Sequence, residues 1–301
     1  MLSGRYRLSR DEVANLLGTV LNVPICPGTV QASCERVSEA LADPVAALEN
    51  ALPAEGALHL DETGWSLAGK RAWLWAAVAK RFSCFAINAK RGVDQLQSWF
   101  PKGFAGIVCS DRWVAYTHFH LKRRQLCWSH LLRDLQAIVD AGGAGKSRAQ
   151  EMLDDRVPFF GDWHRFKAGA FDRATLIART MSFRRGFRAF CREGLHQTAD
   201  RRWRRLGRSL LKLWPAVFRF LVVDGVEPTN NHAERALRPG VLYRRGCQGT
   251  RTVAGSNFVA RMFTAAETCR QQNRPLLEFL EATFRAWLAG TTPPSLLPTP
   301  P

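Results

Sequence analysis

The feature that most constrains the fold is a series of short apolar runs that begins at Leu58 and has no helical period. LHLDETGW, RAWLWAAVAK and FSCFAINAK follow one another, separated by short polar turns at residues 69–70 and 80–81. Runs of this length joined by short turns predict three strands in a meander. VDQLQSWF then has a helical spacing that ends at Pro101, and AGIVCSD and RRQLCW predict two more strands. This order predicts an α/β fold.

The first 50 residues predict a pair of helices. Ser9 with Glu12 three residues later forms a capping box, and apolar residues follow at helical spacing. Two prolines and a glycine interrupt residues 24–28, and Thr29 is expected to cap a second helix that runs through Leu41. Two helices across a short turn fit either a helix-turn-helix that reads DNA or a structural hairpin.

Residues from about 134 to 225 are rich in arginine and mostly helical in period. Residues 179–220 contain 12 Lys or Arg and only 2 acids, so this stretch carries much of the net charge of +17. Such an excess favours polyanionic partners. Basic residues interleaved with aromatic rings predict a surface that follows DNA phosphates, and the alternative is a solvated face of an amphipathic helix pair. Its candidate phosphate ligands are Arg201, Arg202, Arg204 and Arg205.

Three acids are candidates for a metal site. Asp61 and Asp111 follow predicted strands, and acids at the ends of neighbouring strands in an α/β sheet meet at one edge. Glu234 on a later helix would complete the set. Mg²⁺ prefers carboxylate oxygens, and a pair of such ions holds both the attacking and the leaving oxygen in phosphoryl transfer.

Each of these acids has an alternative reading. Glu62 could replace Asp61, although neighbouring strand residues point to opposite faces and only one can face the site. Asp111 could be a turn aspartate that caps the next segment. Asn231 and Glu234 have the spacing of a capping box, in which the glutamate only closes its own helix.

Five motifs in series resemble the IS66 family of insertion-sequence transposases. They are DETGW, SDRW with Tyr116 after it, RQLCWSHLLRD, EPTNNHAERALRP and CRQQNRPLLEFL, and the resemblance as a whole runs from about residue 4 to residue 298. The resemblance implies a ribonuclease-H-like mixed sheet of the DDE type at about 55–290. A mostly helical insertion at about 134–225, a helical segment at 1–50 and a flexible Pro-rich tail at 291–301 complete the predicted organisation.

The resemblance also implies the function. Asp61, Asp111 and Glu234 would hold two Mg²⁺ or Mn²⁺ ions, cleave transposon ends and join them to target DNA, with Glu227 and Glu267 as weaker replacements for Glu234. A homo-oligomer on DNA and element-encoded accessory proteins are the implied partners. The arginines predicted to bind DNA, in addition to the four above, are Arg112, Arg235, Arg238, Arg244, Arg245 and Arg251.

Cys127 and His130 form a C-x-x-H pair without a second half of suitable spacing, so a structural zinc is not predicted. A similar pair follows the second aspartate in several DDE-type families, which implies that Cys127, His130 and His232 neighbour the carboxylates or the DNA. The alternative for His130 is a half-buried histidine at a helix start, and for His232 an exposed side chain. Eight cysteines without a CxxC pair predict reduced thiols and a cytoplasmic, nucleoid-associated protein.

Other functions compete with this one. The longest apolar run, AWLWAAVA, is far shorter than the roughly 20 residues of a membrane span, so no membrane partner is predicted. Full-length family members carry a further N-terminal region with a zinc module, and this sequence starts after it. That difference favours, as the alternative, a non-catalytic DNA-binding remnant that acts as a repressor or is an inactive relic. A ribonuclease or resolvase of the same fold is a further competitor.

Overall fold

The computed structural model describes residues 1–298, and its contacts divide the chain into two units. The first unit combines residues 1–106 with the residues from 231 onward, and the second unit comprises residues 107–230. The strands and helices confirm the predicted mixed α/β class. The N-terminal helices belong to the same unit as the first three strands, and the second unit begins with the fourth strand.

Three antiparallel strands form the sheet of the first unit, as the apolar runs predicted. They are β1 (Ala57–Leu67), β2 (Lys70–Val78) and β3 (Ser83–Asn88). Ala68 and Gly69 join β1 to β2 with φ angles of 51° and 76°. Two successive positive φ angles match the right-handed twist of a hairpin, so the turn fixes the register in which Leu67 pairs with Lys70.

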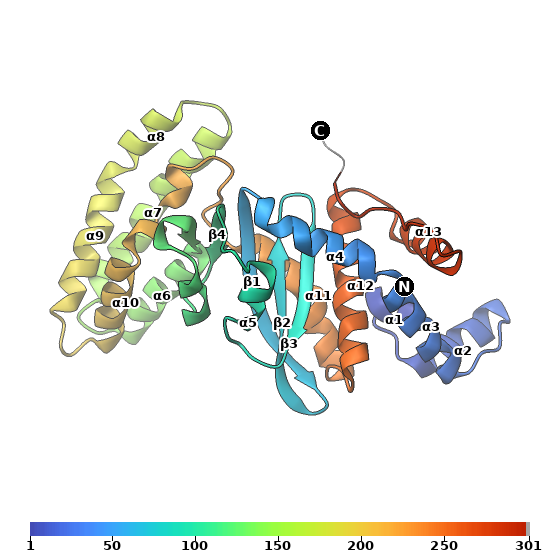
Figure 1. Cartoon of the computed structure of the whole chain (residues 1–301). Helices are drawn as coiled ribbons and strands as arrows, with labels where there is room; N and C mark the ends of the chain where they lie inside the picture. Colours follow the sequence, from blue (N-terminus) through green and yellow to red (C-terminus); the bar gives the residue numbers. More distant parts are fainter. Residues whose placement is uncertain (299–301) are drawn as a thin grey trace. The chain divides into compact units, whose positions relative to one another are not determined.

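Helices pack on this sheet because its two faces are both apolar. α11 (Asn231–Cys247) packs on β1 and β2, and α12 (Val253–Gln271) packs on β3, both on one face in Figure 1. α5 (Asp94–Trp99) follows β3 and ends before Pro101, as predicted. The Trp99 indole donates a hydrogen bond of 3.2 Å to Glu49 of α4 (Ala42–Ala51), so α4 and α5 pack together.

The N-terminal segment holds more helices than the predicted pair. α1 (Leu2–Arg5), α2 (Arg10–Leu21) and α3 (Pro27–Ala40) precede α4, and the short helix η1 (Leu52–Ala54) leads into β1. The capping box of Ser9 and Glu12 is confirmed at the start of α2. The predicted cap at Thr29 is wrong: α3 begins at Pro27, because a proline at the first helical position already has the helical φ angle.

Pro239 and the basic residues after it predict a short helix that ends at the proline and is followed by a basic loop, and this prediction is wrong. α11 instead continues to Cys247 and includes those basic residues. Its buried residues lie on both sides of the proline, so contact with the sheet outweighs a helix-interior proline that costs about 3 kcal/mol. α13 (Leu276–Leu288) follows α12.

The Pro-rich tail, predicted to be flexible, packs against the first unit through Leu296. This side chain is fully buried, and its carbonyl accepts a hydrogen bond of 2.8 Å from the Gln272 amide. The segment therefore continues the fold after α13. Residues 299–301, which complete the predicted tail, lie outside the described residues.

The second unit begins with two short parallel strands and continues as helices. β4 (Ile107–Ser110) pairs with β5 (Arg124–Leu126). The chain between these two strands forms the short helices η2 (Val114–His118) and η3 (Leu121–Arg123). The predicted helical character of the basic stretch is confirmed. Its helices are α6 (Trp128–Ala141), α7 (Lys146–Lys167), α8 (Arg173–Arg179), α9 (Met181–Leu195), α10 (Arg201–Lys212), η4 (Trp214–Ala216) and η5 (Arg219–Leu221).

An aromatic cluster forms the core of these helices. Trp128 lies with its ring centroid 5.2 Å from Phe187 and 5.7 Å from Phe159. Trp203 of α10 stacks on Phe190 of α9 at 5.3 Å. The aromatic residues that alternate with arginines in the sequence therefore fill the core, while most of the arginines between them are exposed.

Candidate active site

Asp61 lies on the face of the sheet that carries α11. Side chains alternate along β1, so Leu60 and Glu62 point to one face while Asp61 and Thr63 point to the other. Thr63 pairs across the strands with Leu74, whose side chain contacts Gly240 of α11. Asp61 was predicted at the end of its strand, but β1 continues through Leu67 because the hairpin with β2 extends that far.

Two ring contacts align α11 with β1. His59 of β1 and His232 of α11 have ring centroids 4.9 Å apart, and Trp65 stacks on Tyr243 at 5.7 Å. Both pairs advance in chain order, so the helix runs alongside the strand in the same direction. The start of α11, which carries Glu234, therefore lies beside the part of β1 that carries Asp61.

Glu62, the alternative to Asp61, is engaged on the opposite face. Its side chain is fully buried, and its carboxylate lies 2.7 Å from the Arg91 guanidinium. Arg91 in turn stacks over the Trp73 ring at 4.6 Å. A buried carboxylate needs a partner of opposite charge, and Arg91 supplies it, so the structure gives Glu62 a structural role.

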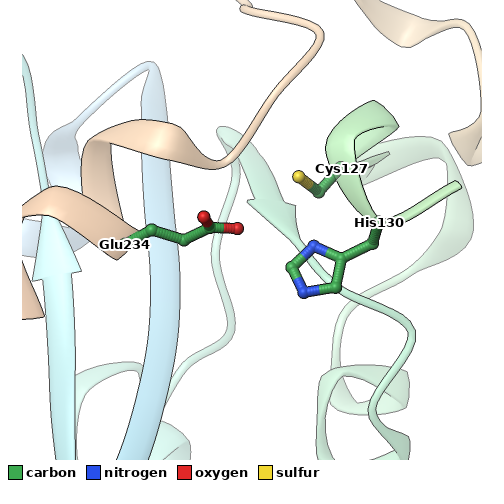
Figure 2. A group of neighbouring side chains, drawn as sticks. All are labelled: Cys127, His130 and Glu234. Atoms are coloured by element: carbon green, nitrogen blue, oxygen red, sulfur yellow. The ribbon is translucent and has the colours of Figure 1, made fainter. Parts of the chain in front are cut away.

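Glu234 is half-buried in the first turn of α11 (Figure 2). The helix begins at Asn231, three residues before Glu234.

The two replacement glutamates are both in salt bridges. Glu227 lies 2.7 Å from the Lys167 ammonium, and Glu267 lies 2.5 Å from the Arg270 guanidinium. Each of these carboxylates thus balances a nearby cation.

Asp111 follows β4 directly in the second unit. Its Oδ1 accepts a hydrogen bond of 2.7 Å from the Trp113 backbone N–H, which is the turn contact proposed as its alternative role. The Asp111 carboxylate can accept further hydrogen bonds or bind a metal ion, since its two oxygens together offer about four lone-pair sites. The turn therefore orients the Asp111 side chain and remains compatible with metal ligation.

Arg124 is a buried arginine beside Asp111 that was not predicted to belong to the site. It is 1% exposed and donates a hydrogen bond of 3.1 Å to the Asp111 carbonyl. Burial lowers the pKa of this guanidinium, and the Asp111 carboxylate opposes that shift. A buried guanidinium needs an anionic or carbonyl partner, and the short strand Arg-Gln-Leu gave no sequence signal that Arg124 would be buried.

Cys127 and His130 lie on one turn at the start of α6, as Figure 2 shows. Cys127 is the N-cap residue of α6, and its sulfur accepts a hydrogen bond of 3.1 Å from the Asn230 backbone N–H. Cys127 thereby holds the chain that leads into α11. His130 interacts electrostatically with Asp134 one turn later, and burial raises the pKa of that carboxyl while Arg112 opposes the shift.

A basic pocket of about 510 Å³ lies between α6 and α10 in the second unit. Arg112, Arg202 and Arg205 line it together with Asp134. Arg112 forms a salt bridge of 2.5 Å with Asp134, and Arg202 donates to the Ala137 carbonyl at 3.0 Å. Arg205 is exposed at the same pocket.

The other predicted DNA-binding arginines divide into two groups. Arg244 donates a hydrogen bond to the Gly64 carbonyl and thus helps to hold α11 on β1, and Arg204 is half-buried. The remaining ones have exposed side chains: Arg201, Arg235, Arg238, Arg245 and Arg251.

Exposed arginines clustered on a strongly basic chain are typical of proteins that bind nucleic acid. The family model of the IS66 transposases matches residues 10–257. The chain belongs to the IS66 family of transposases, as the sequence motifs indicated. No curated protein matches it. In residues 1–298 no helix is long and apolar enough to cross a bilayer.

Proposed function

We propose that this protein is a DDE transposase that cleaves transposon ends and transfers the freed strand to target DNA. The family match carries the proposal, because residues 10–257 include Asp61, Asp111 and Glu234. The order of elements supports a ribonuclease-H-like core: an antiparallel meander, a helix, and then a parallel strand pair. A homo-oligomer on DNA, accessory proteins and a nucleoid location belong to the same proposal.

The donor set fits hard divalent cations. Carboxylate oxygens suit Mg²⁺ or Mn²⁺, and Asp61 and Glu234 come from neighbouring elements on one face of the sheet in the first unit. When bound, two such ions would polarise the attacking and leaving oxygens of the phosphodiester. Asp111 would complete the set, and we propose that Cys127, His130 and His232 support these carboxylates or contact DNA.

The chain's own residues orient the acids. The Trp113 N–H donates a hydrogen bond to the Asp111 side chain, and Arg124 donates one to the Asp111 carbonyl. Within the second unit, the Cys127 sulfur accepts a hydrogen bond from the Asn230 backbone N–H. The arginines of α10 and Arg112 would bind the phosphates on either side of the cleaved bond.

The test is a cleavage gel with end-sequence DNA, with and without Mn²⁺, for the unmutated protein, Asp111→Asn and Asp140→Asn. Asp140 is an exposed acid on α6 and serves as the matched control. We expect cleaved 3′ ends from the unmutated protein and from Asp140→Asn. Asp111→Asn should retain about 1% of the rate or less, with DNA binding intact, because phosphate affinity comes from the cations.

Three outcomes would favour another function. An inactive unmutated protein that still binds DNA would identify a non-catalytic remnant. Cleavage of RNA or of branched junctions in preference to duplex ends would identify a ribonuclease or a resolvase. Cleavage that persists in Asp111→Asn would place the catalytic acids elsewhere.

A further inference from the structure

A second basic pocket lies on the first unit. It has a volume of about 670 Å³, within the range of ligand pockets, and lies between the N-terminal segment, α11 and α12. Five arginines line it against one glutamate, Glu267. The arginines are Arg5, Arg7, Arg235, Arg238 and Arg270.

Four of these arginines have no carboxylate partner in the described part of the chain. The salt bridges of residues 1–298 include Arg270 with Glu267 but leave out the other four. Guanidinium groups that gather without counter-charges repel one another, and an anion bound among them removes that repulsion. The exposed side chains of Arg5, Arg7, Arg235 and Arg238 are open to such an anion.

The pocket has rigid walls. Gly4 of α1 lies against Met262 of α12, with only 2.9 Å available to an added Cβ, so α1 is held on α12. The Cys247 sulfur donates to the Arg7 carbonyl at 3.8 Å and ties this segment to α11. Gln271 donates to the Ala79 carbonyl at 2.9 Å, which fixes the floor. These contacts hold together the segments that carry the arginines.

The pocket adjoins the candidate carboxylates of the same unit. Arg235, Arg238 and Leu242 recur at helical spacing and form one exposed face of α11. His232 also lines the pocket, and its ring lies 4.9 Å from that of His59, two residues before Asp61. A chain of phosphates bound here would thus lead toward Asp61 and Glu234.

We propose that this pocket binds consecutive phosphates of the DNA strand that flanks the cleaved bond. The four guanidinium groups without a carboxylate partner exceed what one phosphate engages, because a single arginine already binds a phosphate through two parallel hydrogen bonds. An extended polyphosphate chain therefore fits better than a lone anion. The choice of DNA as that chain rests on the proposed function.

The test is fluorescence anisotropy with a labelled end-sequence duplex in EDTA, over a series of salt concentrations. Arg235→Gln with Arg238→Gln is compared with a control pair of equal charge, Lys102→Gln with Arg285→Gln, which are exposed outside the pocket. The pocket pair should reduce the slope of log K against log salt by about 2, since each lost phosphate contact removes about 0.9. The control pair should leave it nearly unchanged.

A photo-crosslinking residue locates the contact directly. Leu242→p-benzoylphenylalanine, at the pocket, should crosslink to the duplex, whereas the same replacement of Leu277 on α13 should not; the two leucines are 42% and 57% exposed. Equal slopes for both charge pairs, or crosslinks from Leu277 alone, would overturn the proposal. Inorganic tripolyphosphate that binds the unmutated protein but not the pocket pair, with DNA affinity equal in both, would overturn it in favour of a small anion.

Binding is measured in metal-free buffer, where no metal-dependent cleavage occurs, so the test of the pocket is independent of the proposed catalysis. A pocket-dependent slope together with an unmutated protein that never cleaves would uphold the pocket and reject the enzyme. Normal cleavage and an unchanged slope in the pocket pair would reject the pocket alone.

Discussion

At the residue scale, the two neighbouring acids of β1 have opposite surroundings. Asp61 faces α11, whereas Glu62 is buried and paired with Arg91. Adjacent positions on a strand cannot share a face, so one residue serves the candidate site while the next stabilises the fold.

Replacement of Glu234 should separate catalysis from stability. Glu234→Gln keeps the size of the side chain but removes the charge that a metal ion needs, so we expect loss of cleavage with little change in urea unfolding. Glu62→Gln should show the reverse, with a destabilisation of about 1–3 kcal/mol from the weakened contact to Arg91. Cleavage rates and urea midpoints measured on both variants check this, and normal cleavage by Glu234→Gln would remove it from the site.

Glu49 should make stability depend on pH. Burial raises the pKa of its carboxyl above the ordinary value of 4.5, and the hydrogen bond from Trp99 only partly opposes this. Between the unfolded and folded pKa values the folded state binds more protons, so stability should fall as pH rises through that window. Glu49→Gln does not titrate and should show a smaller fall in urea unfolding from pH 4.5 upward; an identical pH profile would contradict the shift.

At the scale of elements, α11 links the carboxylates to the sheet. Its contact with β2 depends on Gly240, because any Cβ there would meet the Leu74 side chain. The same helix carries Arg244 on the Gly64 carbonyl and Tyr243 on Trp65. A small shift of α11 on the sheet should therefore move Glu234.

Two glycines of α11 provide a matched test of that contact. Gly240→Ala should destabilise the protein by about 1–3 kcal/mol, since the added methyl group overpacks the interface with Leu74. Gly246→Ala meets nothing within 4 Å and should stabilise it by roughly 0.5–1 kcal/mol through higher helix propensity. Thermal or urea unfolding measures both, and equal effects would show that the close approach of helix and sheet is unimportant.

At the scale of the whole molecule, the positive charge of +17 is spread over both units. α10 contributes exposed arginines in the second unit, and the pocket between α1, α11 and α12 contributes others in the first. DNA binding should therefore draw on both units and be sensitive to salt.

Charge reversal on α10 tests the contribution of the second unit. Arg201→Glu, Arg205→Glu and Arg208→Glu together change three exposed side chains and should flatten the salt dependence of DNA binding by about 3 units of slope. Arg202 is left unchanged, because its bond to Ala137 would confuse stability with binding. An unchanged slope, with normal helical circular dichroism, would make this face merely solvated.

Local patterns determined much of the structure. The meander, α5, the capping box of α2 and the helical character of residues 134–225 all follow from contacts between residues near in sequence. The family motifs determined the family itself, since each keeps its residues within a short segment. Periodicity also separated Asp61 from Glu62, because alternation is a property of the strand alone.

Only the tertiary structure decided the features that depend on distant partners. α11 continues through Pro239 because residues on both sides of the proline are buried against the sheet. Leu296 is buried against the first unit, where its carbonyl accepts a hydrogen bond from Gln272. Arg124 donates a hydrogen bond to the Asp111 carbonyl, and the aromatic residues between the arginines pack in the core around Trp128. Burial is set by what the rest of the chain brings to a residue, which no local pattern contains.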